Sequence, residues 1–434
     1  MPQSNIVYRH REAGRPLTDL SDYRRAGGYE ALRKALHELD RDEAVYQFVR
    51  SGLRGRGGAG FPMGRKASFI PKESVLPAYV VCNADESEPG TFKDRELMED
   101  NPFQLLEGIT IAGYGIGAAR GYIYIRGEYE HQARVLDSAI AQARAAGLLG
   151  TGLLGSSFDF DITLYRGAGA YICGEETALL ESLEGKRGQP RLKPPFPAVA
   201  GLYASPTLIN NVETLSALPP IIERGADWYA GVGTEKSTGT KVFSVSGHVV
   251  RPGNYEIVMG DTTLRELIYD IAGGFRPGRE FVAAWVGGSS VNVVGEEALD
   301  TPLDYEALAA AGTSLGSAGC IVMDDSGSIV RSTLRLAHFY RHESCGKCTP
   351  CREGTLWLER ILQRIVDGEG RMEDLELIES LAARINGRVL CALADTGILP
   401  VVSAARRFRE DFVRAIENGG DPRPEPMMEV AVGG

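Results

Sequence analysis

The sequence reads His342-Glu343-Ser344-Cys345-Gly346-Lys347-Cys348-Thr349-Pro350-Cys351-Arg352-Glu353-Gly354 at the point around which the rest of the chain is organised. This run places three cysteines at a spacing of three, so one tight loop can direct three thiolates toward a compact inorganic cube. A fourth ligand is then needed, and Cys391 is the one cysteine that follows in the sequence. Three clustered cysteines and a remote one are typical of a [4Fe–4S] cluster. Structural zinc, the alternative, usually takes its cysteines as two separated pairs, and unliganded thiols are a second alternative.

The composition indicates a soluble globular protein of several domains. At 434 residues the chain is too long for a single ordinary core, and 43 % hydrophobic with 24 % charged residues is a globular composition. No apolar run approaches the roughly 18 residues that span a bilayer, and the first residues lack the features of a secretory signal. We therefore expect a cytoplasmic protein that contacts a membrane only through partners. The net charge of −11 argues against binding to nucleic acid.

A glycine-rich loop is predicted between residues 52 and 66, with five glycines from Gly52 to Gly60. Backbone N–H groups in such a loop can converge on an anion such as phosphate. The substring Gly55–Gly60 satisfies G-x-G-x-x-G, but that dinucleotide fingerprint should follow a strand, and here a helix is expected to precede it. The loop and Lys66 therefore favour a phosphate site of another design, with a flexible arginine-glycine loop as the alternative.

Strands alternate with helices in the next part of the chain. Strands are expected at 78–82, 121–126 and 158–165, and helices near 101–119 and 130–146. This order predicts a parallel sheet with helices on both faces. The first strand runs directly into Asn83–Thr91, and loops after strand carboxyl ends form the ligand crevice of such sheets. Its polar groups suit flavin ring edges and ribose hydroxyls, and a solvated acidic turn is the alternative.

Two later segments carry further candidate ligand groups. Arg166–Leu180 contains several glycines and the adjacent carboxylates Glu175 and Glu176 at the start of a predicted helix. The alternative role of these carboxylates is to offset the helix dipole. Pro190–Pro197 carries one aromatic side chain that could stack on a base, and Asn210–Thr214 offers two amides.

The remaining segments are expected to be structural. Residues 1–27 are polar and poorly periodic, which predicts an extended arm on the surface or on a partner. Residues 240–325 predict a small α+β module with no catalytic set. From about residue 327 the chain is predicted to be helical, with the cysteine run between the first two helices and Cys391 in the connection before the last.

With these motifs assembled, the chain resembles the NADH-binding flavoprotein subunits of respiratory complex I over roughly residues 25–420. The resemblance rests on Ser51–Pro62, Asn83–Gly90, Gly167–Leu180, Arg191–Phe196, Asn210–Thr214 and the cysteine set. It implies an α/β fold in four parts. These are an N-terminal arm with helices and the glycine-rich FMN loop at 1–72, a Rossmann-like parallel-sheet FMN and NADH domain at 73–239, a ubiquitin-like module at 240–326, and a four-helix bundle with a [4Fe–4S] cluster at 327–434.

The resemblance also implies ligand contacts, carried over position by position. The residues expected to contact FMN are Gly55, Gly57, Lys66, Asn83, Asp85, Glu86, Ser87, Tyr171, Gly174, Glu175, Asn210, Asn211 and Thr214. Those expected to hold NADH are Gly58, Phe61, Lys66, Phe69, Glu88, Glu176 and Phe196, with the phenyl rings stacking on the adenine. The implied cluster ligands are Cys345, Cys348, Cys351 and Cys391. Glu88 and Glu176 are the carboxylates expected to tune the catalytic site, and the charge of Glu88 is expected to disfavour NADPH.

The implied activity is oxidation of NADH by hydride transfer to FMN, followed by single-electron transfer to the cluster and on toward quinone. The implied partners are a [2Fe–2S] thioredoxin-like subunit and a large iron–sulfur subunit, in a complex on the cytoplasmic face of the inner membrane. Two alternatives stay open. The same module occurs in soluble NAD-linked hydrogenases and formate dehydrogenases, and a non-enzymatic scaffold with structural zinc is the other alternative.

Overall fold

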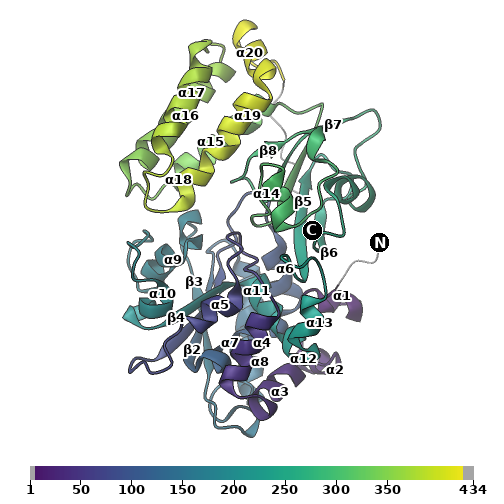
Figure 1. Ribbon diagram of the computed structural model, residues 1–434, viewed down its shortest axis with the longest axis vertical. Coiled ribbons are helices and arrows are strands. Elements are labelled where there is room, and N and C mark those ends of the chain that lie inside the picture. The colour runs from purple at the N-terminus through teal and green to yellow at the C-terminus, as the bar shows by residue number, and fades with distance from the viewer. Residues whose placement is uncertain (1–4, 424–434) are drawn as a thin grey trace.

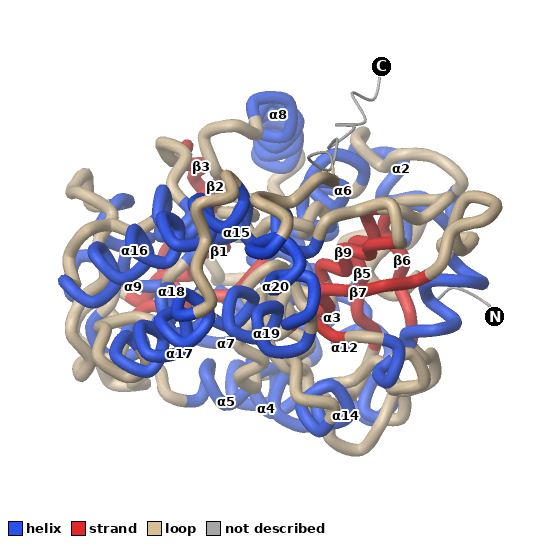
Figure 2. Tube along the Cα trace, turned by 90° about the horizontal axis from the view of Figure 1, so that it is seen from above, coloured by secondary structure: helices blue, strands red, loops and turns tan. Residues whose placement is uncertain are grey.

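The computed structural model describes residues 5–423, which fold into three adjoining parts (Figure 1). A parallel sheet with its helices forms the lower part, a second sheet lies at the upper right, and helices from the last hundred residues form the top. Figure 2, seen from above, shows the second sheet on the right and the last helices beginning directly beside it and extending to the left. The domain limits expected at 72/73, 239/240 and 326/327 stay predictions, and residues 1–4 and 424–434 lie outside the described residues.

The parallel sheet has four strands in the order β3-β2-β1-β4. Its strands are β1 (Ala78–Ala84), β2 (Ala118–Ile125), β3 (Asp161–Arg166) and β4 (Thr207–Asn211). Alternate side chains of β1 belong to two different hydrophobic cores, one on each face of the sheet. Val80 packs with helices α7 (Pro102–Ile116) and α8 (Glu130–Ala145), whereas Val81 packs with α9 (Glu176–Leu183). The predicted parallel sheet with helices on both faces is therefore confirmed.

Two elements of this part were not predicted. Strand β4 is short and ends in two asparagines, so its sequence lacks a strand pattern, yet Thr207–Asn210 are buried beside β1. Helix α6 (Lys93–Asp100) is highly charged, and its sequence is typical of a solvated segment. Both Lys93 and Asp94 are nevertheless buried, because they pair with other charged side chains in the interior.

The N-terminal segment is not an extended arm, and that expectation is wrong. It contains α1 (Arg9–Ala13) and α2 (Leu20–Arg25), and its few large side chains, including Tyr8, Leu17 and Tyr23, are buried. Irregular spacing hid them from a periodicity analysis. The helices that follow are α3 (Glu30–Glu38), α4 (Arg41–Arg50) and α5 (Met63–Ser68), and the glycine-rich loop connects α4 to α5. The prediction that a helix precedes this loop is confirmed.

The second sheet has five strands in the order β6-β5-β9-β7-β8, with β5 and β9 parallel at its centre. Its elements are β5 (Thr240–Gly247), β6 (Gly253–Val258), a π-helix (Glu266–Ile271), β7 (Phe281–Val286), β8 (Val293–Val294), α14 (Tyr305–Ala310) and β9 (Gly319–Asp324). An opening hairpin, a crossing helix and a central parallel strand pair form the expected ubiquitin-like module.

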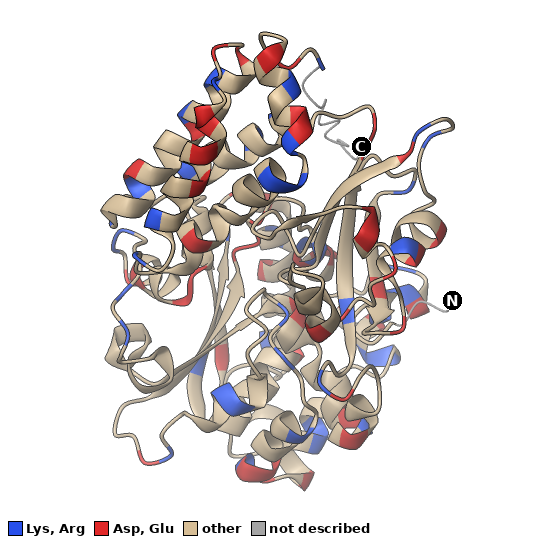
Figure 3. Cartoon of the chain, turned by 45° about the horizontal axis from the view of Figure 1, so that its top comes forward, with Lys and Arg blue, Asp and Glu red and all other residues tan. Residues whose placement is uncertain are grey.

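The last part is a helical bundle. Its helices are α15 (Ile329–Glu343), α16 (Thr349–Val366), α17 (Glu373–Ile385), α18 (Ala392–Gly397), α19 (Leu399–Arg407) and α20 (Arg409–Glu417). Leu358, Ile361, Leu362 and Ile365 are buried on one face of α16, as predicted. Basic and acidic residues are interspersed over the elements visible in Figure 3. Within residues 5–423, no helix is both long and apolar enough to cross a bilayer.

Candidate active site

A cavity of about 300 Å³ lies where the carboxyl end of β1 meets loops from all three parts, and we call it the central cavity. Its volume is at the lower end of the range for small-molecule sites. It is lined by Gly57, Ala59, Asn83, Asp85, Glu86, Ser87, Glu88, Thr91, Lys93, Asp94, Tyr171, Ile172, Gly174, Glu175, Asn211, Ser317, Cys391, Ala392, Leu393 and Thr396. The sheet therefore places its ligand crevice at the edge that the strand order predicts.

The structure brings many of the predicted ligand residues into this lining and leaves others outside it. Those outside are Gly55, Gly58, Phe61, Lys66, Phe69, Glu176, Phe196, Asn210 and Thr214. Phe61 and Phe69 have ring centroids 6.3 Å apart, and together with Phe196 they are exposed. The Lys66 ammonium donates to Glu176 Oε2 and to the Ile209 carbonyl, each at 3.0 Å. Lys193 donates to Glu175 at 2.9 Å and to Glu176 at 3.0 Å.

The loop after β1 is fixed by its own polar groups. The Asn83 amide donates to the Gly174 carbonyl at 2.8 Å, and Asn83 Oδ1 accepts from the Asp85 N–H at 3.1 Å. The Glu86 carboxylate accepts from the N–H groups of Asp94 and Arg95 in the first turn of α6. Burial raises the pKa of Asp85 to about 7 and that of Glu86 to about 7, and the charge of Asp94 adds to the effect at Glu86. Two carboxyl groups that titrate near neutral pH therefore line one wall.

A buried ion-pair network includes two of the lining residues, Lys93 and Asp94, and it was not predicted from the sequence. The Lys93 ammonium is 2.6 Å from Asp94 Oδ1 and 2.9 Å from Glu213 Oε2, with each side chain no more than 3 % exposed. Burial lowers the pKa of Lys93, but the charges of Asp94 and Glu213 raise it by more, so the ammonium persists. Asn211 Nδ2 donates to Asp94 Oδ2 at 2.7 Å, which connects the network to β4.

The groups around the central cavity fit a flat, polar ring system such as a flavin. Asp85 Oδ2, in the lining, and Asn210 Nδ2, on the adjoining strand, are buried and have no hydrogen-bond partner. Such orphaned atoms are rare in the interior and mark places where a ligand can supply the partner. A Cβ on Gly57 would come within 2.9 Å of Asn211 Cβ, so this wall accepts no side chain. One acceptor, one amide donor and a bare backbone suit the carbonyl and N–H groups of a flavin edge.

The four predicted cluster cysteines meet at the junction of α15, α16 and α18. Cys345 and Cys348 lie in the loop before α16, Cys351 in its first turn, and Cys391 at the N-cap of α18. The Leu390 N–H donates to Cys348 Sγ at 3.3 Å, and Ser344 Oγ lies 3.2 Å from Cys351 Sγ. Hydrogen bonds of this kind are typical around iron–sulfur ligands.

The spacing of these sulfurs distinguishes a cluster from a zinc ion. Around one tetrahedral zinc the sulfurs would lie ~3.8 Å apart. Among the described residues, the set of three or more potential ligands whose atoms all lie within 4.8 Å of one another is His10, Glu96 and Asp100, which contains no cysteine. No three of the four thiols lie this close together, which favours an iron–sulfur cube, with its larger separation between ligands, over a single zinc ion.

The cysteine site and the central cavity share a wall. Cys391 lines the cavity, and the next residues, Ala392 and Leu393, continue the same surface. Burial, followed by the charge of Glu175 and of the neighbouring thiols, raises the pKa of Cys391 to about 11. Ligation of a metal at Cys391 therefore displaces a proton.

The ubiquitin-like module also reaches the cavity, so the expectation that it is only structural is wrong. Ser317, just before β9, belongs to the lining. The Tyr305 hydroxyl donates to the Gly55 carbonyl in the glycine-rich loop at 2.8 Å. Two further residues, Ser289 and Ser290, donate to Glu88 from the loop after β7. A glycine pair at the carboxyl end of β7 was the sequence signal.

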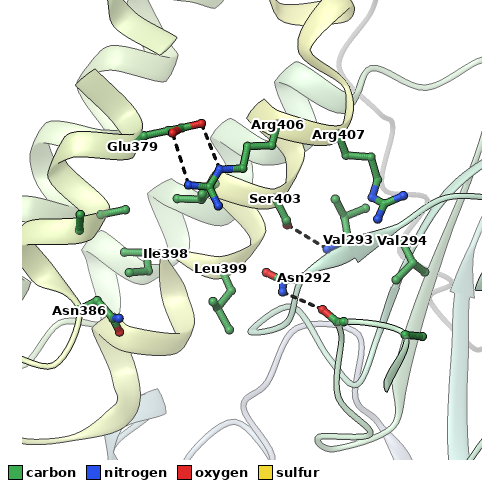
Figure 4. Close-up of a pocket in the computed structure, with 15 residues that line it drawn as sticks. Asn292, Val293, Val294, Glu379, Asn386, Ile398, Leu399, Ser403, Arg406 and Arg407 are labelled. Carbon is green, nitrogen blue, oxygen red and sulfur yellow. Dashed lines mark hydrogen bonds and ion pairs between the residues drawn. The ribbon is translucent and has the colours of Figure 1, made fainter. Parts of the chain in front are cut away.

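A separate groove of about 730 Å³ lies between this module and the bundle (Figure 4). It is bounded by β8, α17 and α19. The Val293 N–H donates to Ser403 Oγ at 3.0 Å across the groove, and Arg406 pairs with Glu379 at 3.0 Å. None of the predicted site residues lines it.

Comparison with known proteins agrees with this geometry. Residues 49–220 match the Nuo51 FMN-binding domain, and residues 331–415 match the NADH-ubiquinone oxidoreductase-F iron-sulfur binding region. The NADH-quinone oxidoreductase F subunit 2 of Rhizobium meliloti is 55 % identical over 92 % of this chain and 94 % of its own length. The chain belongs to the family of NADH-quinone oxidoreductase F subunits. The F subunit of Mycobacterium tuberculosis strain H37Rv is 49 % identical over 100 % of this chain and 98 % of its own length.

A solved structure resembles this member of the family as well. A chain of an NAD⁺-reducing [NiFe]-hydrogenase matches with a TM-score of 0.79 and 36 % identity. The match covers 87 % of this chain and 63 % of the hydrogenase chain, so the hydrogenase chain extends well beyond the shared part. Both matched domains, the FMN-binding one and the iron–sulfur one, fall on the two sites described above.

Proposed function

We propose that this protein is the electron-input subunit of a respiratory NADH:quinone oxidoreductase, with FMN in the central cavity and a [4Fe–4S] cluster on Cys345, Cys348, Cys351 and Cys391. The observation that carries the proposal is that Cys391 belongs to both sites. FMN held by the residues of this cavity would supply the means to accept the electron pair of a hydride from NADH and to release electrons singly to an iron–sulfur cluster. A shared wall keeps that transfer short.

The chain's own residues bind and orient in this proposal. Gly57 and Gly174 leave bare backbone at the cavity wall, while Asn83, Asp85 and Asn211 present polar groups to a flavin edge. The remaining predicted FMN contacts, Gly55, Lys66, Glu86, Ser87, Tyr171, Glu175, Asn210 and Thr214, surround or support this wall. No acid or base is required for hydride transfer, so positioning is the protein's main contribution.

We assign nucleotide binding to the exposed aromatic side chains and the two carboxylates. Phe61, Phe69 and Phe196 are exposed rings on which an adenine can stack, with Gly58 and Lys66 beside them. Glu176 is paired with two lysines, whereas the donors to Glu88 are neutral groups. Glu88 therefore keeps an uncompensated negative charge, which should repel the extra phosphate of NADPH. If Glu88→Gln left the ratio of NADH to NADPH oxidation unchanged, this role would be wrong.

The family assignment also suggests a setting. We place the protein on the cytoplasmic face of the inner membrane, held there by a [2Fe–2S] thioredoxin-like subunit and a large iron–sulfur subunit. The relatives named as F subunits match almost their whole length, which favours a respiratory complex over the hydrogenase alternative. If the neighbouring genes encoded hydrogenase subunits, the protein would instead be assigned to an NAD-linked hydrogenase.

The proposal is tested by purifying the full chain after anaerobic reconstitution and measuring FMN, iron, sulfide and zinc. We expect FMN together with iron and sulfide, and reduction of ferricyanide by NADH. Stoichiometric zinc with neither FMN nor iron would contradict the proposal. Iron and sulfide without FMN would contradict the cavity assignment alone.

A further inference from the structure

The carboxylate of Glu88 lies near hydrogen-bonding groups from all three parts of the molecule. Tyr171, from the parallel-sheet part, donates its hydroxyl to Oε2 at 2.6 Å. From the ubiquitin-like module, Ser289 donates its hydroxyl to Oε1 at 3.1 Å and Ser290 donates its backbone N–H at 2.8 Å. From α15 of the bundle, the Tyr340 hydroxyl lies 3.4 Å from the same oxygen. Both oxygens are thus fixed, and the carboxylate faces the central cavity in one orientation.

Tyr340 acts mainly through Ser289. Their oxygens are 2.5 Å apart, which is closer than Tyr340 lies to Glu88. Since the single proton of Ser289 goes to Glu88, the phenol must donate to Ser289. Burial, followed by the charge of Glu88, raises the pKa of Tyr340 well above its ordinary value, so the phenol remains a donor. The result is a chain of donors from the bundle to the cavity carboxylate.

The approach of the loop depends on two glycines. Gly287 and Gly288 have φ of +120° and +97°, which side chains rarely tolerate. A Cβ on Gly288 would lie 2.6 Å from Glu88 Cγ. The loop after β7 is therefore shaped to bring Ser289 and Ser290 against one carboxylate.

Helix α15 adds a second link on the same side. Glu343, at its end, accepts from the Tyr171 N–H at 2.9 Å, and the Phe339 ring meets the Tyr171 ring edge-on with centroids 5.2 Å apart. Cys345 follows two residues later. The helix that leads to the cysteine run thus also fixes the residue that holds Glu88.

We propose that Ser289, Ser290 and Tyr340 are positioning residues that orient Glu88, so that nucleotide affinity depends on the ubiquitin-like module and the bundle being docked on the cavity. The inference rests on the proposed function, because it takes Glu88 to face the nucleotide. It gives the ubiquitin-like module a direct part in substrate recognition.

The test compares Ser289→Ala and Tyr340→Phe with two controls in the FMN-loaded protein. Ser403→Ala removes a hydroxyl from the interface between the same module and the bundle, where it pairs with Val293 and not with Glu88. Tyr114→Phe removes a phenol that donates to the Leu39 carbonyl at 2.8 Å outside the cavity. For each variant one measures NAD⁺ affinity by calorimetry without turnover, KM and kcat for NADH, FMN content and Tm.

We expect Ser289→Ala and Tyr340→Phe to weaken NAD⁺ binding and raise KM by about threefold to tenfold, the usual effect of one lost hydrogen bond. The kcat, FMN content and Tm should match the controls. The double variant should be little worse than Ser289→Ala alone, because both changes break one chain of donors. Restoring the hydroxyl with Ser289→Thr should recover most of the affinity.

Nucleotide affinities equal to those of the controls would overturn the proposal. Equal losses in Ser403→Ala would overturn it too, because the effect would then be general loosening of the interface. Failure of the proposed function gives a different result, in which the unmodified protein itself holds no FMN or does not oxidise NADH.

Discussion

The cysteine site and the central cavity share a wall, but the chain assembles them in different ways. Three of the four thiols come from residues 345–351, and only Cys391 is remote. The cavity lining instead runs from Gly57 to Thr396 and includes residues from every part of the fold. The cysteine site is therefore largely a local structure, whereas the cavity needs residues from all three parts of the fold.

This difference determines what each site can tolerate. A local loop can keep its shape when distant regions shift, because its geometry is set by short-range turns such as the one at Gly346. The cavity has no such protection. Its walls are held by long-range contacts, including those of Glu88 to the module and the bundle. Mutations at the two sites should accordingly differ in how far their effects spread.

The largest expected effect separates Cys345 from Cys391. Alanine at either position removes one of four ligands, so iron and sulfide should be lost from both variants. Only Cys391→Ala should also lower FMN content, because Cys391 lines the cavity. Metal analysis and flavin absorbance check this. Cys320→Ala, a buried cysteine in the ubiquitin-like module, is the control and should keep both cofactors. Equal flavin loss from both cluster variants would remove the distinction between the sites.

The next largest effect concerns the charges behind the cavity wall. Lys93→Met should destabilise the folded protein by about 3–5 kcal/mol, because Asp94 would be left buried without its cation and Glu213 would keep only Lys241. Lys72→Met removes an exposed pair with Asp42 and should cost less than ~1 kcal/mol. Denaturant unfolding of the FMN-free protein measures both. Similar losses in the two variants would mean that the buried network does not support the wall.

Features that depend on residues close together in the sequence could be predicted, whereas features that depend on tertiary packing could not. The cysteine spacing and the strand-helix alternation are local patterns, and the structure brings the four cysteines together and forms the predicted parallel sheet. The polar loop after β1 was also found, because strand ends in a parallel sheet share one edge. Lys93 and Ser317 were missed because nothing local distinguishes them, and Ser289 is marked only by the glycine pair that precedes it. Only tertiary packing makes a lysine in a charged helix a buried ion pair.

A smaller effect tests the bare backbone of the cavity wall. A Cβ on Gly174 would meet only Asp85 atoms, at 3.6 Å, which is ordinary van der Waals contact. Gly174→Ala should therefore leave the Tm of FMN-free protein unchanged while it reduces FMN affinity by about tenfold, the usual cost of an extra methyl group in a filled site. Gly57→Ala is the comparison variant. Its Cβ would lie 2.9 Å from Asn211 Cβ, so this substitution should lower both the Tm and the FMN affinity. Unchanged FMN binding in Gly174→Ala would place the flavin elsewhere.

The most gradual expected effect is a dependence of stability on pH, spread over several pH units. Burial raises the pKa of Asp85 from 3.8 to about 7. Between these values the folded protein holds a proton that the unfolded chain releases, so stability falls as pH rises, by at most ~1.4 kcal/mol per pH unit. Asp85→Asn should flatten this part of the profile in FMN-free protein, whereas Asp42→Asn, on the surface, should not. Thermal melts at pH 4 to 8 measure it, and a rise in stability with pH that Asp85→Asn removes would contradict the assignment.

A contact between the N-terminal segment and the ubiquitin-like module has a consequence for biosynthesis. The N–H groups of Val7 and Tyr8 donate to the carboxylate of Glu256, which is buried and lies 249 residues from Val7 in the sequence. These early residues leave the ribosome well before their acceptor does. At ordinary elongation rates they wait roughly 12 to 50 s for it. The N-terminal segment must therefore stay unpaired, or be shielded by a chaperone, until the ubiquitin-like module has been translated.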